Sequence, residues 1–338
     1  MEYRILGRTG VSVSTYCLGT MMFGRWGNPD VDECVAMVDT ALDAGVNFID
    51  TADVYDFGTS EEIVGRALRG RRDQVVLATK FHNPMGEDPN SRGNSRRWIH
   101  RAVEDSLRRL GTDWIDLYQV HRPDPGTDLD ETLGTLSDLV RAGKVRLIGT
   151  STFPADLLVE AQWVSERRSR ERFVTEQPPY SILARGIESG VLPVCQRYGL
   201  GALVYSPLNG GWLTGKYRSE EPPAGSRAAR EPDHFDFGGA AHRSKTAAVE
   251  ALAALAQQAG ISLIELSLAW VLHHPAVDSV IIGPRTPDQL RDQLRGAGQV
   301  LDAGLLDRID EIVPPGTNLS AADAGWTDPA LSPSKRRR

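Results

Sequence analysis

Short apolar segments alternate along the chain with longer segments of helical spacing. Residues 32–44 illustrate the helical segments, because apolar side chains recur every three or four positions and a glycine follows. Residues 46–50, Val-Asn-Phe-Ile-Asp, illustrate the short ones, which predict buried strands. The predicted strands are residues 16–20, 46–50, 74–80, 114–121, 145–150, 173–177, 200–205 and 280–283. The predicted helices are residues 32–44, 60–68, 95–110, 129–142, 154–167, 187–198, two within 245–274, 287–294 and 302–313.

Strands and helices in strict alternation predict an α/β fold, and eight such strands predict a (β/α)8 TIM barrel over residues 1–338 as a single domain. A doubly wound sheet is the competing fold, but the turn at residues 19–24 lacks the glycine pattern of that fold's first turn. Residues 3–6 and 11–14 predict an N-terminal β-hairpin. Beyond the minimal barrel stand a long loop after strand 7 (208–244), the extra C-terminal helices and a C-terminal tail (315–338) running over the surface.

Composition narrows the class of protein. Of the 338 residues, 41% are hydrophobic and 25% charged, as in soluble globular proteins. The net charge of -7 argues against binding to nucleic acid. No apolar run has the length of a membrane span, since the longest, 263–272, is short and contains Glu265. Three scattered cysteines form neither a disulfide framework nor a metal motif, so a cytoplasmic protein without a metal site is expected. The sequence leaves open whether it forms a homo-oligomer.

Polar side chains end three consecutive predicted strands. Asp50, Lys80 and His121 stand at the ends of strands two, three and four, and Tyr55 follows Asp50 by five residues. In a barrel of this kind the C-terminal strand ends surround the active site. The period of two places each of the three end residues on a face that can point into the barrel. By themselves, Asp50 and Tyr55 would read as a helix cap and a packing aromatic, but Lys80 and His121 favour catalysis.

This set of side chains suits proton donation to a carbonyl oxygen. Tyrosine ordinarily holds its proton at neutral pH, and a neighbouring ammonium favours the phenolate. Lys80 can supply that ammonium, Asp50 can keep it charged, and His121 can orient a substrate oxygen. Because a proton donor alone does not reduce a carbonyl, a hydride source is implied.

The sequence therefore resembles the aldo-keto reductase superfamily over roughly residues 3–315, since Asp50, Tyr55, Lys80 and His121 match its tetrad in order, spacing and strand. The resemblance implies an NADPH-dependent oxidoreductase. It implies that Tyr55 is the general acid, that Lys80 and Asp50 promote its proton release, and that His121 orients the substrate or relays a proton.

The resemblance also implies a cofactor site at the later strand ends. Ser151 and Gln177 match contacts of the nicotinamide carboxamide, whereas Thr152 stands where the family usually has Asn. Arg285, after strand eight, matches the residue that holds the 2′-phosphate of NADP, and the helix that Thr286 can cap offers an anion-binding N-terminus. The other positions that correspond to cofactor contacts are Tyr205, which stacks on the ring, then Ser206, Leu208, Gly210, Gly283, Gln289 and Gln293, the last standing where Asn is common.

Two other motifs are set aside. Residues 210–216 fit the first seven positions of a P-loop, but Tyr217 stands where the magnesium-binding Ser or Thr belongs. A metal centre built on Asp50 and His121 lacks a second histidine, and Lys80 would repel the ion. Residues that can contact a substrate lie on the loops around the predicted mouth: Phe23, Trp26, His82, Arg122 and Trp212.

The function expected from the sequence is NADPH-dependent reduction of a small-molecule aldehyde or ketone. A reductase of keto groups on nucleotide sugars is an alternative of the same class. A regulatory subunit that senses NADPH, resembling channel β subunits, is an alternative of another class, although the short segment before the hairpin argues against a tethering role. A lyase forming a Schiff base on Lys80 is a third, and it predicts trapping by borohydride.

Overall fold

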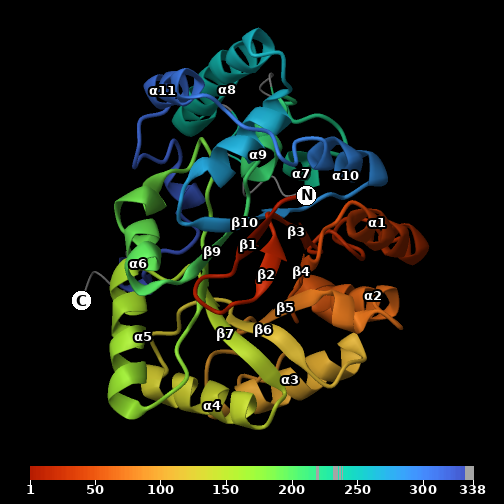
Figure 1. Ribbon diagram of the computed structural model, residues 1–338, viewed down its shortest axis with the longest axis vertical. Coiled ribbons are helices and arrows are strands. Elements are labelled where there is room, and N and C mark those ends of the chain that lie inside the picture. Colours follow the sequence, from red (N-terminus) through yellow and green to blue (C-terminus); the bar gives the residue numbers. More distant parts are fainter. Residues whose placement is uncertain (218–220, 231–234, 236, 238, 332–338) are drawn as a thin grey trace.

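The computed structural model describes residues 1–217, 221–230, 235, 237 and 239–331. Within these residues, eight parallel strands close into a barrel in the order β10-β3-β4-β5-β6-β7-β8-β9, with helices around it (Figure 1). The prediction of a (β/α)8 barrel is therefore confirmed. The barrel strands are β3 (Tyr16–Gly19), β4 (Phe48–Asp50), β5 (Val76–Phe81), β6 (Ile115–Val120), β7 (Val145–Ser151), β8 (Thr175–Gln177), β9 (Gly201–Val204) and β10 (Val277–Ile282).

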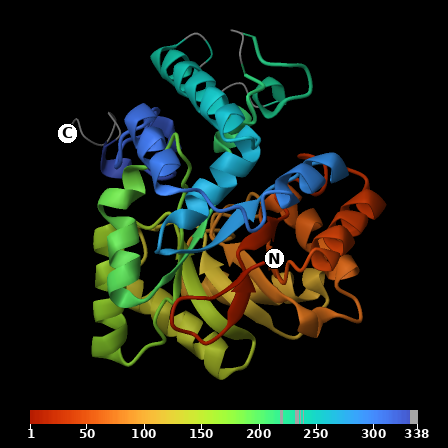
Figure 2. The same ribbon diagram turned by 45° about the horizontal axis from the view of Figure 1, so that its top comes forward.

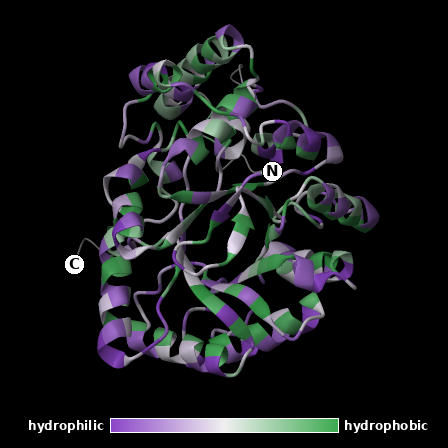
Figure 3. Cartoon of the chain, viewed as in Figure 1, coloured by the Kyte–Doolittle hydropathy of each residue, from purple (hydrophilic) through white to green (hydrophobic). Residues whose placement is uncertain are grey.

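The helices lie close to their predicted positions. Figure 3 shows hydrophilic and hydrophobic positions alternating along the peripheral helices, as the sequence pattern requires. The α-helices are α1 (Val31–Asp43), α2 (Thr59–Ala67), α3 (Arg96–Leu110), α4 (Leu129–Arg141), α5 (Ala155–Arg168), α6 (Val191–Tyr198), α7 (Arg227–Arg230), α8 (Ala240–Gln258), α9 (Leu263–His273), α10 (Pro287–Leu294) and α11 (Ala303–Ile312). The 3-10 helices are η1 (Tyr55–Gly58), η2 (Arg72–Gln74), η3 (Gly186–Ser189), η4 (Asn209–Thr214), η6 (Ala321–Ala324) and η7 (Pro329–Leu331).

The N-terminal hairpin closes one end of the barrel. β1 (Tyr3–Ile5) and β2 (Ser12–Ser14) pair antiparallel, as predicted, and lie across the barrel in Figure 1. Leu6 and Val13 on the hairpin are fully buried against Phe48 and Leu117 inside the barrel. Because this plug lies where the strands begin, chemistry is left to the opposite end, where they finish.

Two elements differ from the prediction for local reasons. β10 begins at Val277, three residues earlier than expected, because polar Asp278 and Ser279 hide the strand in the sequence pattern. The Asp278 carboxylate accepts a hydrogen bond from the backbone of Gly7 at 2.7 Å, and Ser279 donates to the carbonyl of Ser14 at 2.8 Å. The helix expected over 187–198 is divided at Gly190 into η3 and α6.

The two segments outside the minimal barrel are more ordered than the sequence suggested. The loop predicted over 208–244 contains η4, α7 and the start of α8, which rises from the barrel in Figure 2. Residues 218–220, 231–234, 236 and 238 of that loop and residues 332–338 of the tail lie outside the described residues. The tail from residue 315 is exposed or partly exposed along its described length, and η6 is fixed to α8 by an ion pair.

Candidate functional site

The ends of β4, β5 and β6 bring the four predicted side chains together. Asp50 is the last residue of β4, Lys80 is the next-to-last of β5, and His121 follows β6 directly. Tyr55 opens η1 after a loop that is tied to β5, because the amide of Asp53 donates to the carbonyl of Lys80 at 3.1 Å. Strand register and this loop therefore place Tyr55 beside Lys80.

Lys80 forms the centre of a buried polar network. Its side chain is fully buried, and its Nζ makes an ion pair with Oδ1 of Asp50. The same Nζ donates to the carbonyl oxygen of Thr51 at 2.8 Å and to the hydroxyl of Tyr55 at 3.3 Å. Burial acts to lower the pKa of Lys80, but the charges of Asp50 and Tyr55 and the hydrogen bonds to them outweigh burial and raise it. Lys80 therefore stays an ammonium, with Tyr55 as a direct neighbour.

Two glutamines complete the surroundings of Asp50. Nε2 of Gln119 donates to Oδ2 of Asp50 at 3.2 Å, and Nε2 of Gln177 donates to the same oxygen at 2.9 Å. The sequence assigned Gln177 to the cofactor and gave Gln119 no role. Both side chains hold the carboxylate that holds Lys80, and only the closed barrel brings β8 opposite β4.

His121 is a neutral imidazole with a defined tautomer. Burial, followed by the positive charges of Lys80, Arg122 and His82, lowers its pKa well below the usual value. The amide nitrogen of Asn83 lies 3.1 Å from Nδ1 of His121. Since an amide nitrogen only donates, Nδ1 is the acceptor, and Nε2 carries the hydrogen. The rings of His121 and Tyr55 meet edge to face, with centroids 5.9 Å apart.

The ends of β7 and β9 hold the residues expected around a nicotinamide. Ser151 donates to the carbonyl of Gln177 at 2.9 Å, and Thr152 donates to the carbonyl of Ser151 at 2.7 Å. Arg122 in turn donates to the Thr152 hydroxyl at 3.3 Å. Burial is the main cause that raises the pKa of Tyr205 to about 12, so its hydroxyl stays protonated. Thr152 and Ser206 have φ values of 57° and 56°, and such strained backbone often marks functional sites.

Cations gather beside the loops after β9 and β10. Burial, followed by the positive charges of Arg285, Arg230 and Arg227, lowers the pKa of Lys216. Side chains that repel one another in this way favour an anion between them. Of these cations, the sequence predicted only Arg285 as a phosphate contact. Lys216 appeared there only as the last residue of the rejected P-loop match. A cluster formed by residues from two separate loops has no signature along one segment of chain.

The N-terminal part of α10 supplies backbone and amide groups beside these cations. Thr286 caps α10 by accepting from the backbone of Gln289 at 3.3 Å, and Oε1 of Gln289 accepts from the backbone of Arg285 at 2.8 Å. Gln293 is 7% exposed, and its Oε1 has no hydrogen-bond partner. A buried acceptor without a partner is costly, so Gln293 suits a bound group that donates to it.

The substrate candidates differ in exposure. Phe23 is fully buried and Trp212 is 4% exposed. Trp26, 37% exposed, packs edge to face on Phe57, 60% exposed, with ring centroids 6.0 Å apart. Phe57 lies two residues after Tyr55, and the sequence alone did not single it out. His82 and Arg122 are intermediate in exposure.

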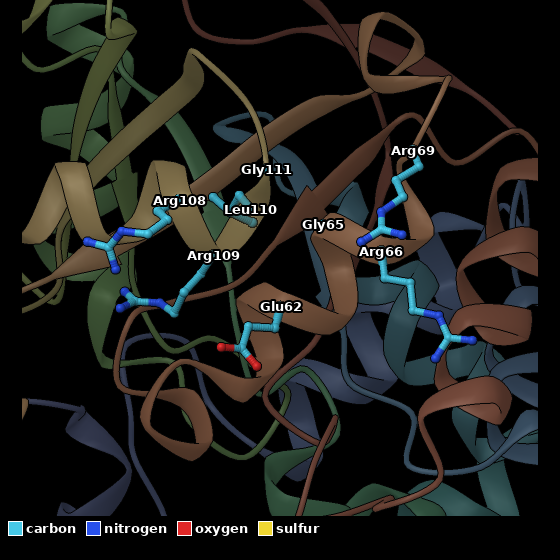
Figure 4. A pocket seen from close by; sticks show the side chains of 8 residues that line it. All are labelled: Glu62, Gly65, Arg66, Arg69, Arg108, Arg109, Leu110 and Gly111. Atoms are coloured by element: carbon cyan, nitrogen blue, oxygen red, sulfur yellow. The ribbon is translucent and has the colours of Figure 1, made fainter.

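A separate pocket of about 340 Å³ lies on the outer side of α2 and α3. In Figure 4 the side chains of Arg108 and Arg109 lie on one side of it and those of Arg66 and Arg69 on the other. Arg66, Arg108 and Arg109 each pair with a carboxylate of this chain, so the pocket offers few unpaired charges.

Neither a metal-binding group of side chains nor a single membrane-spanning helix is present among the residues that the structure describes. Across them, no group of three or more His, Cys, Asp and Glu side chains is arranged to hold a metal ion. No single helix among them has the length and apolar character to cross a membrane. The bent pair α8 and α9, which meet at 94°, meets those criteria only when the two helices are combined.

Comparison with known proteins decides the family. Residues 16–314 match the model of the Aldo/keto reductase family. The chain belongs to this family. Among its relatives, the "Uncharacterized oxidoreductase YrpG" of Bacillus subtilis is 43% identical over 328 residues, which cover 93% of this chain and 96% of the relative.

Other aldo/keto reductase relatives carry two kinds of name. The "Aldo-keto reductase YhdN" of B. subtilis is 38% identical, with 86% of this chain and 87% of the relative covered. The "Probable voltage-gated potassium channel subunit beta" of Oryza sativa subsp. japonica is 36% identical, with 93% and 97% covered. Family membership and the relatives named as oxidoreductases support an oxidoreductase.

Proposed function

We propose that this protein is an NADPH-dependent reductase that transfers hydride to an aldehyde or ketone, with Tyr55 as the general acid. The observation that carries the proposal is the placement of the Lys80 ammonium 3.3 Å from the Tyr55 hydroxyl, inside a buried ion pair with Asp50. Family membership and the relatives named as oxidoreductases support the same class of reaction.

In this proposal each side chain has a separate task. Tyr55 gives its hydroxyl proton to the carbonyl oxygen of the substrate, and Lys80 stabilises the phenolate that remains. Asp50, held by Gln119 and Gln177, keeps Lys80 charged in a buried site. His121 donates from Nε2 to the same substrate oxygen, because Asn83 occupies Nδ1.

The residues present fit a nicotinamide dinucleotide with a 2′-phosphate. Lys216, Arg227, Arg230 and Arg285 supply positive charge for phosphates, and the N-terminus of α10 adds backbone donors. Gln293 offers a buried acceptor without a partner, which suits a donating base such as adenine. Tyr205 would lie against the nicotinamide, with Ser151, Thr152, Gln177, Ser206, Leu208, Gly210 and Gly283 as the other proposed contacts. When bound, this cofactor supplies the hydride.

The proposed function is tested with a panel of aldehydes, ketones and keto sugars while NADPH absorbance is followed. Tyr55→Phe should lower turnover roughly 100-fold or more, since it removes the proton donor, while NADPH binding is retained. Tyr198→Phe on α6 is the matched control and should leave turnover unchanged. Equal turnover in wild type and Tyr55→Phe would contradict the role of Tyr55.

Two alternatives remain connected to particular observations. The channel-subunit names of several relatives favour an NADPH-sensing regulatory subunit, which would bind NADPH without reducing any carbonyl of the panel. Strong preference for keto sugars within the panel would select the nucleotide-sugar reductase. A Schiff-base lyase is disfavoured, because the raised pKa of Lys80 keeps it an ammonium and a poor nucleophile.

A cytoplasmic location is part of the proposal, supported by three buried, unpaired cysteines.

A further inference from the structure

The C-terminal tail is attached to the loop after β9 by three polar side chains from distant parts of the chain. Nζ of Lys245 on α8 lies 2.7 Å from Oδ2 of Asp323 in η6 and donates to Oδ1 of Asn209 at 2.8 Å. Nδ2 of Asn209 donates to the same Asp323 oxygen at 3.1 Å. These three residues, here called the tail node, join η4, α8 and η6, so each segment fixes the other two.

Charge and burial make the tail node a single unit. The side chains of Lys245 and Asp323 are 8% and 19% exposed. Among the described residues, Asp323 is the carboxylate that forms an ion pair with Lys245. Removing Asp323 would therefore leave an ammonium almost without solvent and without a counter-charge, which is far more costly than losing a surface pair.

The tail node holds strained backbone in the proposed cofactor loop. Asn209 has a φ of 49° and Ser206 a φ of 56°, and Gly210 and Gly211 continue with positive φ. Asparagine tolerates left-handed backbone better than most residues with a side chain, and contacts around it fix that conformation. For Asn209 those contacts come from Lys245 and Asp323, with Ser181 adding an acceptor at 3.4 Å.

The same tail reaches the proposed nicotinamide contact. Leu319 pairs with the backbone of Leu183, so the segment before η6 is anchored beside the loop after β8. Gly325, directly after η6, lies so close to Tyr205 that an added Cβ would stand 2.8 Å from the Tyr205 hydroxyl oxygen. The tail therefore meets the site both through Asn209 and beside Tyr205.

We propose that Asp323 is a positioning residue for the cofactor: through Lys245 and Asn209 it holds the loop after β9 in the conformation that retains NADPH. The inference rests on the proposed function, because it assumes that this loop covers a nicotinamide cofactor. It adds a site component from the tail, which the sequence assigned to the surface. The tail node determines how slowly the cofactor is released, whereas Tyr55 and Lys80 determine the rate of the chemical step.

Release of NADPH, measured by stopped-flow fluorescence, tests this inference. Asp323→Asn should accelerate release roughly tenfold, the effect of losing one charged hydrogen bond that the bound state depends on. Asp328→Asn, in the exposed part of the same tail, is the matched control and should release NADPH as the wild type does. Asp323→Glu keeps the negative charge, so its release of NADPH should be slower than that of Asp323→Asn. A merely structural role would lower thermal stability without changing release from the folded protein.

Two further comparisons sharpen the result. Lys245→Met combined with Asp323→Asn should accelerate release no more than the stronger single variant, because the node acts as one unit. A chain ending at Gly325 should retain slow release, whereas one ending at Leu319 should lose it; if the shorter chain does not fold, Asp323→Asn decides. A wild type that binds no NADPH would overturn the proposed function and this inference together. Slow release from both wild type and Asp323→Asn would overturn this inference alone.

Discussion

The side-chain amide of Asn83 donates to Nδ1 of His121 over 3.1 Å, and this bond selects which ring nitrogen of His121 carries the hydrogen. Asn83 lies in the loop after β5, whereas His121 follows β6, so the contact depends on the neighbouring strands. It leaves Nε2 as the donor that our proposed mechanism requires.

Asn83→Asp should disturb that choice of tautomer. A carboxylate accepts from Nδ1–H, so the hydrogen moves away from Nε2, and the added negative charge raises the pKa of His121. We expect kcat/KM to fall by roughly 10- to 100-fold at neutral and higher pH, with a smaller loss at low pH, where protonated His121 again carries a hydrogen on Nε2. The pH-rate profile from pH 5 to 9 measures this. Asn90→Asp, in an exposed part of the same loop, should leave the profile unchanged.

Lys80→Met, compared with the same change combined with Asp50→Asn, should separate the role of Lys80 in stability from its role in turnover. It leaves the Asp50 carboxylate buried without its ammonium, so the free energy of unfolding should fall by about 3–5 kcal/mol in urea titrations. Asp50→Asn added to Lys80→Met removes the unpaired charge and should recover most of that stability. Turnover should stay lost in the double variant, because the phenolate of Tyr55 has no ammonium beside it. Recovery of turnover together with stability would contradict the role of Lys80.

Arg285→Ala should weaken NADPH binding more than NADH binding. The guanidinium lies among the cations that lower the pKa of Lys216, and the two cofactors differ by the 2′-phosphate alone. We expect the dissociation constant of NADPH to rise roughly tenfold or more relative to that of NADH, as for loss of a charged hydrogen bond. Arg291→Ala, whose partner Asp288 is exposed on the same helix, serves as the control. Equal losses for both cofactors would remove the assignment of Arg285 to the 2′-phosphate.

Glu176 makes the stability of the fold depend on pH. Burial raises the pKa of its carboxyl to about 8, although Thr150 and the backbone of Phe153 donate hydrogen bonds to it. Because the folded state binds this proton more tightly than the unfolded state, the stabilisation is complete below the unfolded pKa near 4.5 and is lost as pH rises toward 8.

Glu176→Gln should therefore remove a pH dependence of the unfolding free energy. The variant should gain on the wild type between pH 5 and 8, by an amount on the order of 4 kcal/mol at the upper end. Chemical denaturation at several pH values measures the difference, with the exposed Glu171→Gln as control. A constant difference across this range would show that folding does not raise the pKa of Glu176.

The sequence by itself determined the order of elements and four residues of the site. Apolar strands that finish on Asp50, Lys80 and His121 are visible because alternation and strand ends are local properties, and Tyr55 lies within five residues of the first. The N-terminal hairpin could also be predicted from the sequence, because its two strands are joined by a single short turn. The resemblance to a family added the residues expected to contact a cofactor.

Only the tertiary structure decided which side chains hold these four in place. Gln177 contacts Asp50 across 127 positions of sequence and Asp323 contacts Asn209 across 114, so no local pattern contains either pair. Likewise the burial of Phe23 and Trp212 depends on packing and is not visible in the sequence. The hydrophobic periodicity that predicts helices and strands is a property of residues close together in sequence. Closure of the barrel and docking of the tail depend instead on surfaces that meet only after folding.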